Sequence, residues 1–120
     1  MFIPIHPDER IPVEIDGVTF FVKPLTGETG NTWYFMFKKY RALVDSGDKS
    51  DEAEKKIIEM ESELFDFIVI GWESVDKKIA AFPEDNKPSK MFNHFDINEL
   101  VFGKFYTAAR GLSIDEKKSS

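Results

Sequence analysis

The sequence predicts an α+β fold, in which an N-terminal antiparallel β-hairpin packs on a cluster of three to four α-helices. Two patterns support this fold class. β-Branched and aromatic residues surround an Asp-Gly pair near the N-terminus, and apolar residues recur at helical spacing through the rest of the chain. The chain has 120 residues, 42% of them hydrophobic, and no Gly/Pro-rich linker. We therefore expect one domain over residues 1–112 and a disordered tail over residues 113–120.

The predicted hairpin pairs residues 11–15 with residues 18–23 across Asp16-Gly17. Asp-Gly favours a type I′ turn because both central residues of that turn need positive φ. Pro24 ends the second strand because it has no backbone N–H to donate. A helix should begin near residue 28, and three side chains offer oxygens that can cap it: Thr26, Thr29 and Asn31.

The first predicted helix carries one apolar stripe and ends before Gly47. The stripe consists of Trp33, Met36, Phe37, Tyr40 and Val44. Phe35 lies on the opposite side of the helix, next to Lys38 and Lys39, where an aromatic ring gains little from the domain's own core. Either a loop or the hairpin covers Phe35, or this ring contacts a partner.

The second predicted helix begins with Ser50 or Asp51 as its N-cap and extends to Trp72. Its apolar stripe consists of Ala53, Ile57, Met60, Leu64, Phe67 or Ile68, and Gly71. From Leu64 onward nearly every side of the helix is apolar, and Asp66 is the one charge, so other elements must cover this half from all sides. Ile70 and Trp72 lie off the centre of the stripe. The hairpin, the last helix or a second chain should cover them.

The C-terminal third predicts a short connection, a brief helix near Met91, and a last helix that begins at a capping box formed by residues 96–99. The last stripe consists of Ile97, Val101, Phe105, Ala108 and Leu112. The predicted core of the domain contains Phe20 or Phe21, Trp33, Phe37, Ile57, Leu64, Ile68, Val101 and Phe105.

Composition and charge narrow the classes of function. The net charge is −6 with a pI near 4.9, so the overall field repels phosphate backbones and makes nucleic acid a poor partner. The chain has no cysteine, which excludes disulfides and thiolate chemistry and suits the cytoplasm. The N-terminal residues lack the pattern of a signal peptide, and the longest apolar run is too short to span a membrane.

The sequence offers few residues for catalysis or for a metal site. Its two histidines, His6 and His94, lie far apart and lack the helical spacing of zinc ligands. The acidic segment over residues 45–51 lacks the ligand pattern of an EF-hand and is interpreted as a solvated, helix-capping turn. We therefore expect no enzymatic activity, no cofactor and no bound metal.

Several short motifs together resemble one known family. The hairpin leads into Lys23-Pro24-Leu25-Thr26, and a helical middle is followed by Gly71-Trp72-Glu73-Ser74-Val75 and later by Phe82-Pro83-Glu84-Asp85-Asn86. These pieces, spread over roughly residues 11–110, resemble the small tail assembly chaperones of long-tailed phages and prophages. The chain departs from the pattern after Val75, where Asp76-Lys77-Lys78 replaces an expected Asp-Gly turn.

The resemblance implies a non-enzymatic protein of the host bacterial cytoplasm. Such chaperones bind the aggregation-prone tape measure protein before the tail tube polymerises around it, and they can self-associate. Helical position suggests five residues for partner contacts: Tyr34, Phe35, Ile70, Trp72 and Phe102. Three alternatives stay open at this stage: a structural tail or head-tail connector subunit, a small enzyme or metal-dependent module, and a generic cytoplasmic interaction domain.

Overall fold

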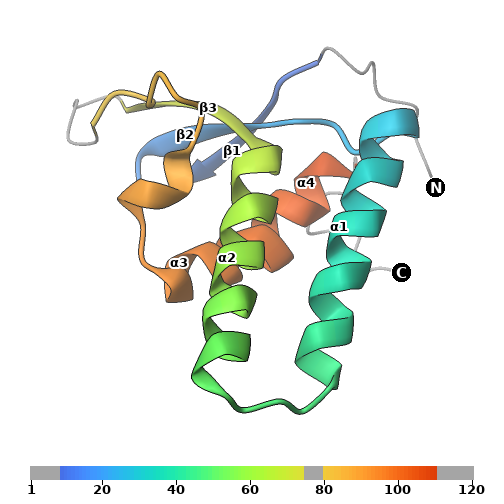
Figure 1. The fold of residues 1–120 in the computed structure, drawn as a ribbon. Helices are drawn as coiled ribbons and strands as arrows, with labels where there is room; N and C mark the ends of the chain where they lie inside the picture. Colours follow the sequence, from blue (N-terminus) through green and yellow to red (C-terminus); the bar gives the residue numbers. More distant parts are fainter. Residues whose placement is uncertain (1–8, 75–79, 111–120) are drawn as a thin grey trace.

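The computed structural model describes residues 9–74 and 80–110, and it confirms the α+β fold with an N-terminal hairpin packed on helices. A three-stranded antiparallel sheet lies across one end of the helices, at the top of Figure 1. Below it, α1 (Gly27–Asp45) and α2 (Asp51–Ile68) form a helical hairpin, and the C-terminal helical segment lies beside both of them (Figure 1).

The hairpin forms as its turn chemistry predicts. β1 (Ile11–Ile15) pairs with β2 (Val18–Val22), and Ile15 lies opposite Val18. The φ angles of the intervening Asp16 and Gly17 are 51° and 82°, the positive values that a type I′ turn requires. Phe20 and Val22 point into the core and are buried. Of the two candidates at positions 20 and 21, Phe20 is therefore the core residue.

The prediction of a second helix that reaches Trp72 is wrong. α2 ends at Ile68, and β3 (Val69–Ser74) adds to the free edge of β2, so that Trp72 lies opposite Phe20. β-Branched and aromatic residues dominate the segment after Ile68, and they suit a strand as well as a buried helix. The unpaired edge of the hairpin decides between these two outcomes because its N–H and C=O groups need partners.

Gly71 lies in β3 of the sheet and does not belong to a helix stripe. The Arg10 guanidinium lies over the Phe21 ring, 4.2 Å from its centre. A Cβ atom on Gly71 would displace the end of that flexible arginine side chain. The register between β2 and β3 is irregular near Phe21 and Val22, which pair with Gly71 and Val69, so Ile70 is an extra residue in a β-bulge.

The caps of α1 and α2 confirm the predicted helix starts. Thr26 is the N-cap of α1, and its backbone N–H donates to the Thr29 hydroxyl at 3.2 Å. The side chain of Ser50 caps α2 and accepts from the backbone N–H of Ala53 at 3.2 Å. Gly47, with a φ of 74°, follows the C-cap of α1.

The C-terminal segment begins with η1 (Pro88–Met91), a 3₁₀ helix. It continues as one helix through α3 (His94–Leu100), the π-helical η2 (Val101–Phe105) and α4 (Tyr106–Ala109). The predicted capping box at Asp96 is wrong because Asn93 is the N-cap. The Asn93 side-chain oxygen accepts from the backbone N–H of Asp96 at 2.9 Å. The helix therefore begins at His94, earlier than expected.

Asp66, the one charge in the apolar run, anchors η1 to α2. Its two carboxylate oxygens accept from the backbone N–H and the hydroxyl of Ser89, each at 2.8 Å. Ser89 itself is buried. This pair of hydrogen bonds explains how a carboxylate is tolerated in the most apolar part of the sequence.

The core lies between the sheet, α2 and the C-terminal helix, and it matches most of the predicted list. The residues confirmed as buried are Phe20, Trp33, Leu64, Ile68, Val101 and Phe105. Phe37 and Ile57 are only half-buried, and Val44 is exposed, so the stripe of α1 stops before its last turn. Ala109 is buried where Ala108 was expected.

Some predictions lie outside the described residues: His6, the Asp76-Lys77-Lys78 segment, Leu112 and the tail over residues 113–120. Within residues 9–74 and 80–110, no helix has the length and apolar character needed to cross a membrane. The same residues contain no group of three or more His, Asp or Glu side chains arranged to hold a metal ion.

Candidate functional site

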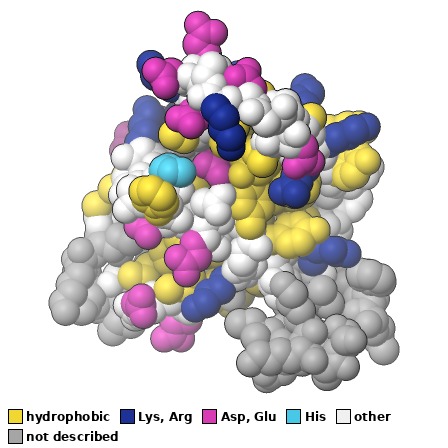
Figure 2. All heavy atoms as spheres, turned by 90° about the horizontal axis from the view of Figure 1, so that it is seen from below, with side chains coloured by type: hydrophobic (Ala, Val, Ile, Leu, Met, Phe, Trp, Pro, Cys, Tyr) yellow, Lys and Arg dark blue, Asp and Glu magenta, His cyan; other side chains and the backbone are white. Residues whose placement is uncertain are grey.

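An aromatic groove separates α1 from the C-terminal helix. It consists of two cavities of about 450 and 150 Å³ that share Trp33, Phe37 and Tyr106 as lining residues. The larger cavity is also lined by Tyr40, Arg41, Asn98 and Phe102, and the smaller by Leu25, Gly30, Tyr34 and Arg110. Figure 2 views the molecule from the side of the α1–α2 loop, where hydrophobic side chains gather beside Lys and Arg. We call the two cavities together the α1 groove.

Ring contacts form the floor of the α1 groove. Phe102 contacts Tyr40 in a stacked arrangement and Phe37 edge to face, with ring centres 5.3 and 5.7 Å apart. Trp33 stacks on Tyr106 at 5.9 Å. These contacts link α1 to the C-terminal helix through side chains alone, and Phe37, Phe102 and Tyr106 remain only half-buried. The groove therefore keeps aromatic surface for a further contact.

The π-helical turn of η2 aligns the C-terminal helix with this groove. Ile97, Val101, Phe105 and Ala109 are all buried, although steps of four residues would drift by about 40° each around a regular α-helix. The wider π turn offsets that drift. As a result, a second row at the same spacing lines the groove: Asn98, Phe102, Tyr106 and Arg110.

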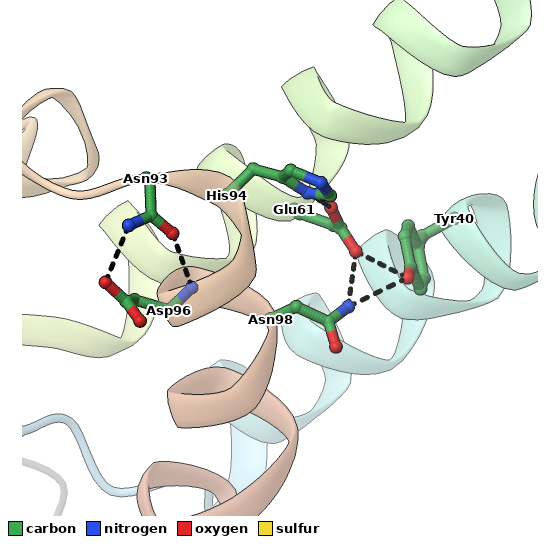
Figure 3. A network of polar contacts seen from close by, with 6 residues as sticks. All are labelled: Tyr40, Glu61, Asn93, His94, Asp96 and Asn98. Atoms are coloured by element: carbon green, nitrogen blue, oxygen red, sulfur yellow. Dashed lines mark hydrogen bonds and ion pairs between the residues drawn. The ribbon is translucent and has the colours of Figure 1, made fainter.

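A buried polar network closes the groove at the Asn98 end (Figure 3). Glu61 of α2 is only 3% exposed, and one of its oxygens accepts from the Tyr40 hydroxyl at 2.8 Å and from the Asn98 amide. Its other oxygen lies 3.2 Å from Nδ1 of His94. Tyr40 lies on α1, whereas His94 and Asn98 lie on α3. The Glu61 carboxylate of α2 therefore connects three helices (Figure 3).

The network also sets the protonation of its tyrosine. Burial, together with the hydrogen bond to Glu61 and the charge of that carboxylate, raises the pKa of Tyr40 to about 12. Tyr40 therefore stays a neutral hydrogen-bond donor at physiological pH. One Glu61 oxygen accepts from Tyr40 and Asn98 and the other contacts His94, so the buried carboxyl group is hydrogen-bonded and the network links α1, α2 and α3 beside the groove.

The structure separates the five predicted contact residues. Tyr34 and Phe35 are exposed, at 57% and 60%, and their rings contact each other edge to face at 5.4 Å. Tyr34 lines the α1 groove, as does Phe102. Phe35 faces the other flank of α1, where it lines a 300 Å³ cavity with Met60 of α2. Phe35 is thus exposed, and no loop or hairpin residue within 9–74 and 80–110 covers it.

The other two predicted contact residues lie in or beside the sheet. Trp72 is buried, with ring contacts to Phe20 and Phe82 at 6.0 and 4.9 Å, and its indole N–H donates to the Ala80 carbonyl at 2.7 Å. The domain's own residues therefore cover Trp72, which leaves it little surface for a partner. Ile70 is half-buried in the β-bulge and does not line either cavity of the α1 groove.

Several groove residues were not predicted as contact sites. Trp33 and Phe37 were placed in the core, while Arg41, Asn98, Tyr106 and Arg110 were not singled out. The repeat of four between Asn98, Phe102, Tyr106 and Arg110 is visible in the sequence. However, it predicts one face of a helix only once the π turn is known, because four-residue steps drift around a regular α-helix.

Comparisons with protein-family models, curated proteins and solved structures give no match for this chain. The resemblance to phage tail assembly chaperones therefore stays a prediction from the sequence motifs.

Proposed function

We propose that this protein is a non-enzymatic phage tail assembly chaperone, which binds the tape measure protein in the host bacterial cytoplasm and keeps it soluble during tail assembly. The observation that carries this proposal is the aromatic surface of α1, where the α1 groove and the exposed Tyr34 and Phe35 lie on one helix. Exposed aromatic surface of this kind is typical of sites that bind protein partners. The identity of the partner rests on the sequence motifs.

Charge supports a solubilising role. The chain has a net charge of −6, and α2 contributes seven acidic residues against two basic ones. An apolar segment of a partner that binds along α1 would be shielded from water, while the acidic charge on the rest of the complex would oppose aggregation. Binding through exposed rings and half-buried ones needs no unfolding of the chaperone's own core.

The motif around Trp72 supports the proposal in a different way. Trp72 and Phe82 belong to the two pieces of the family-like pattern, and they pack against each other edge to face. This contact explains why both motifs occur in one chain, because it packs β3 against the segment that leads into η1. The motif thus contributes to the fold, and we place the proposed partner surface on α1.

Co-expression tests the proposed function. We expect the tape measure protein from the same genome to shift from the pellet to the soluble fraction when this chain is present, and the two proteins to co-purify. Tyr34→Ala should reduce that effect, whereas Phe95→Ala, which removes an exposed ring on α3 outside the groove, is the matched control. No gain in the solubility of the tape measure protein with the unaltered chain would contradict the proposal.

A second measurement separates the chaperone from a structural tail or head-tail connector subunit. Mass spectrometry of purified virions should find no stoichiometric amount of this protein, since a chaperone leaves before the tail is complete. Its presence at the copy number of a tail component would replace the proposed function with the structural one.

A further inference from the structure

The charges at the α1 groove oppose the charge of the whole chain. Among the described residues that line its two cavities are Arg41 and Arg110, and none of the lining residues is a carboxylate. Asp45 pairs with Arg41 at 3.4 Å in the solvent-exposed last turns of α1 and offsets part of this charge. Glu61 lies beneath Tyr40 and is buried. Arg110 donates to the Tyr106 hydroxyl at 3.2 Å, and its guanidinium lies over the Tyr106 ring. The lining of the groove is therefore aromatic with a basic side chain toward each end, whereas the whole chain is acidic.

The dimensions of the groove suit a short stretch of helix. Gly30 and Arg41 mark its extent along α1, and eleven steps along an α-helix cover about 16 Å. This length corresponds to about three helical turns of a partner, enough for three or four apolar side chains at i, i+4, i+7 and i+11. The half-buried rings of Phe37, Phe102 and Tyr106 provide the aromatic surface against which such side chains pack.

From this combination we infer that the α1 groove binds an amphipathic α-helix of the partner protein, with acidic residues flanking its apolar stripe. Arg41 and Arg110 attract the acidic flanks, and the ring floor binds the stripe. The inference builds on the proposed function by naming the surface and the chemistry of the bound segment. A basic or neutral helix with the same apolar stripe lacks these acidic flanks and should bind more weakly.

Synthetic helices test this inference without the tape measure protein. Two labelled peptides share one apolar stripe, and their flanking residues are all Glu in one and all Lys in the other. Fluorescence anisotropy should show the Glu-flanked peptide binding at least about tenfold more tightly than the Lys-flanked peptide. The preference should shrink when the salt concentration rises from about 0.1 M to about 1 M, because salt screens exposed charges.

Variants locate the binding surface. Arg41→Glu should weaken binding of the Glu-flanked peptide about tenfold and strengthen binding of the Lys-flanked one, a reversal that a purely structural role would not produce. Phe37→Ala should weaken binding of both peptides. Phe95→Ala is the matched control, since this phenylalanine is 76% exposed on α3 and does not line the groove. Circular dichroism confirms that each variant is folded.

The outcomes keep this inference separate from the proposed function. Equal affinity for the two peptides, or a loss of binding with Phe95→Ala and not with Phe37→Ala, would overturn the groove assignment even if the tape measure protein is solubilised. Selective binding of the Glu-flanked peptide, reversed by Arg41→Glu, would uphold it even if the tape measure protein is not the partner. A change in oligomeric state with Phe37→Ala would instead identify a second copy of this chain as the occupant and overturn the inference.

Discussion

The core beneath the sheet and the α1 groove are both built from aromatic residues, yet they differ in how completely those residues are buried. Phe65 and Phe105 have no exposed surface, and they contact rings contributed by the sheet and the η1 region. Phe37 and Phe102 are half-buried, and the rings that they contact lie on α1 and the C-terminal helix. The same type of residue therefore stabilises the fold where the sheet, α2 and the C-terminal helix converge, and leaves ring surface exposed along the groove between α1 and the C-terminal helix.

Core substitutions should show the largest difference between the two regions. Phe65→Ala removes a fully buried ring and should lower the free energy of unfolding by about 3–5 kcal/mol. Phe37→Ala, at the half-buried floor of the groove, should cost about 1 kcal/mol. Urea denaturation followed by tryptophan fluorescence measures both values. Similar costs for the two changes would mean that the groove is part of the core.

Removing the buried carboxylate of Glu61 should have the second-largest effect on stability. Glu61→Ala leaves Tyr40 and Asn98 without their acceptor and should lower the free energy of unfolding by about 1.5–3 kcal/mol. Glu63→Ala, two residues along α2 on an exposed position, is the matched control and should change stability by less than about 0.5 kcal/mol. Thermal denaturation of the two variants side by side tests the prediction, which fails if they melt together.

The raised pKa of Tyr40 predicts a smaller effect on stability, which depends on pH. Its pKa is raised to about 12 in the folded protein, from an ordinary value of 10.0. The unfolded chain therefore loses this proton first, and stability should fall as the pH rises from about 10 to about 12, by up to about 2 kcal/mol. Tyr40→Phe should flatten this part of the stability profile, while Tyr34→Phe, at an exposed tyrosine, serves as the control. Parallel profiles for all three proteins would contradict the assignment.

The exposed rings should have the smallest effect on stability. Tyr34→Ala and Phe35→Ala should each change the free energy of unfolding by less than about 0.5 kcal/mol, because both side chains are more than half exposed. Of the two, we expect only Tyr34→Ala to weaken binding to the Glu-flanked helix, since Phe35 faces the other flank of α1. Equal losses would place the bound helix across the outer face of α1 instead.

Local patterns of residues were enough to predict the hairpin, its turn, a short set of candidate caps for α1 and α2, and most of the core. Asp16-Gly17, Thr26 and Ser50 act through their immediate neighbours, so their roles can be recognised without knowing the fold. The position of Phe35 opposite the apolar stripe follows from helix periodicity as well, whereas its exposure was left open by the sequence and is decided by the fold.

The remaining features depend on contacts between segments far apart in the chain. The segment after Ile68 becomes a strand because the hairpin has a free edge for it, and Trp72 enters the core for that reason. Asp66 is satisfied by Ser89, 23 residues later. The π turn of η2 rotates Phe102 and Tyr106 toward α1, so the groove exists only in the folded chain. Short-range propensities select turns and caps, whereas the partners of a strand edge, a buried charge and a helix face are settled when distant segments pack together.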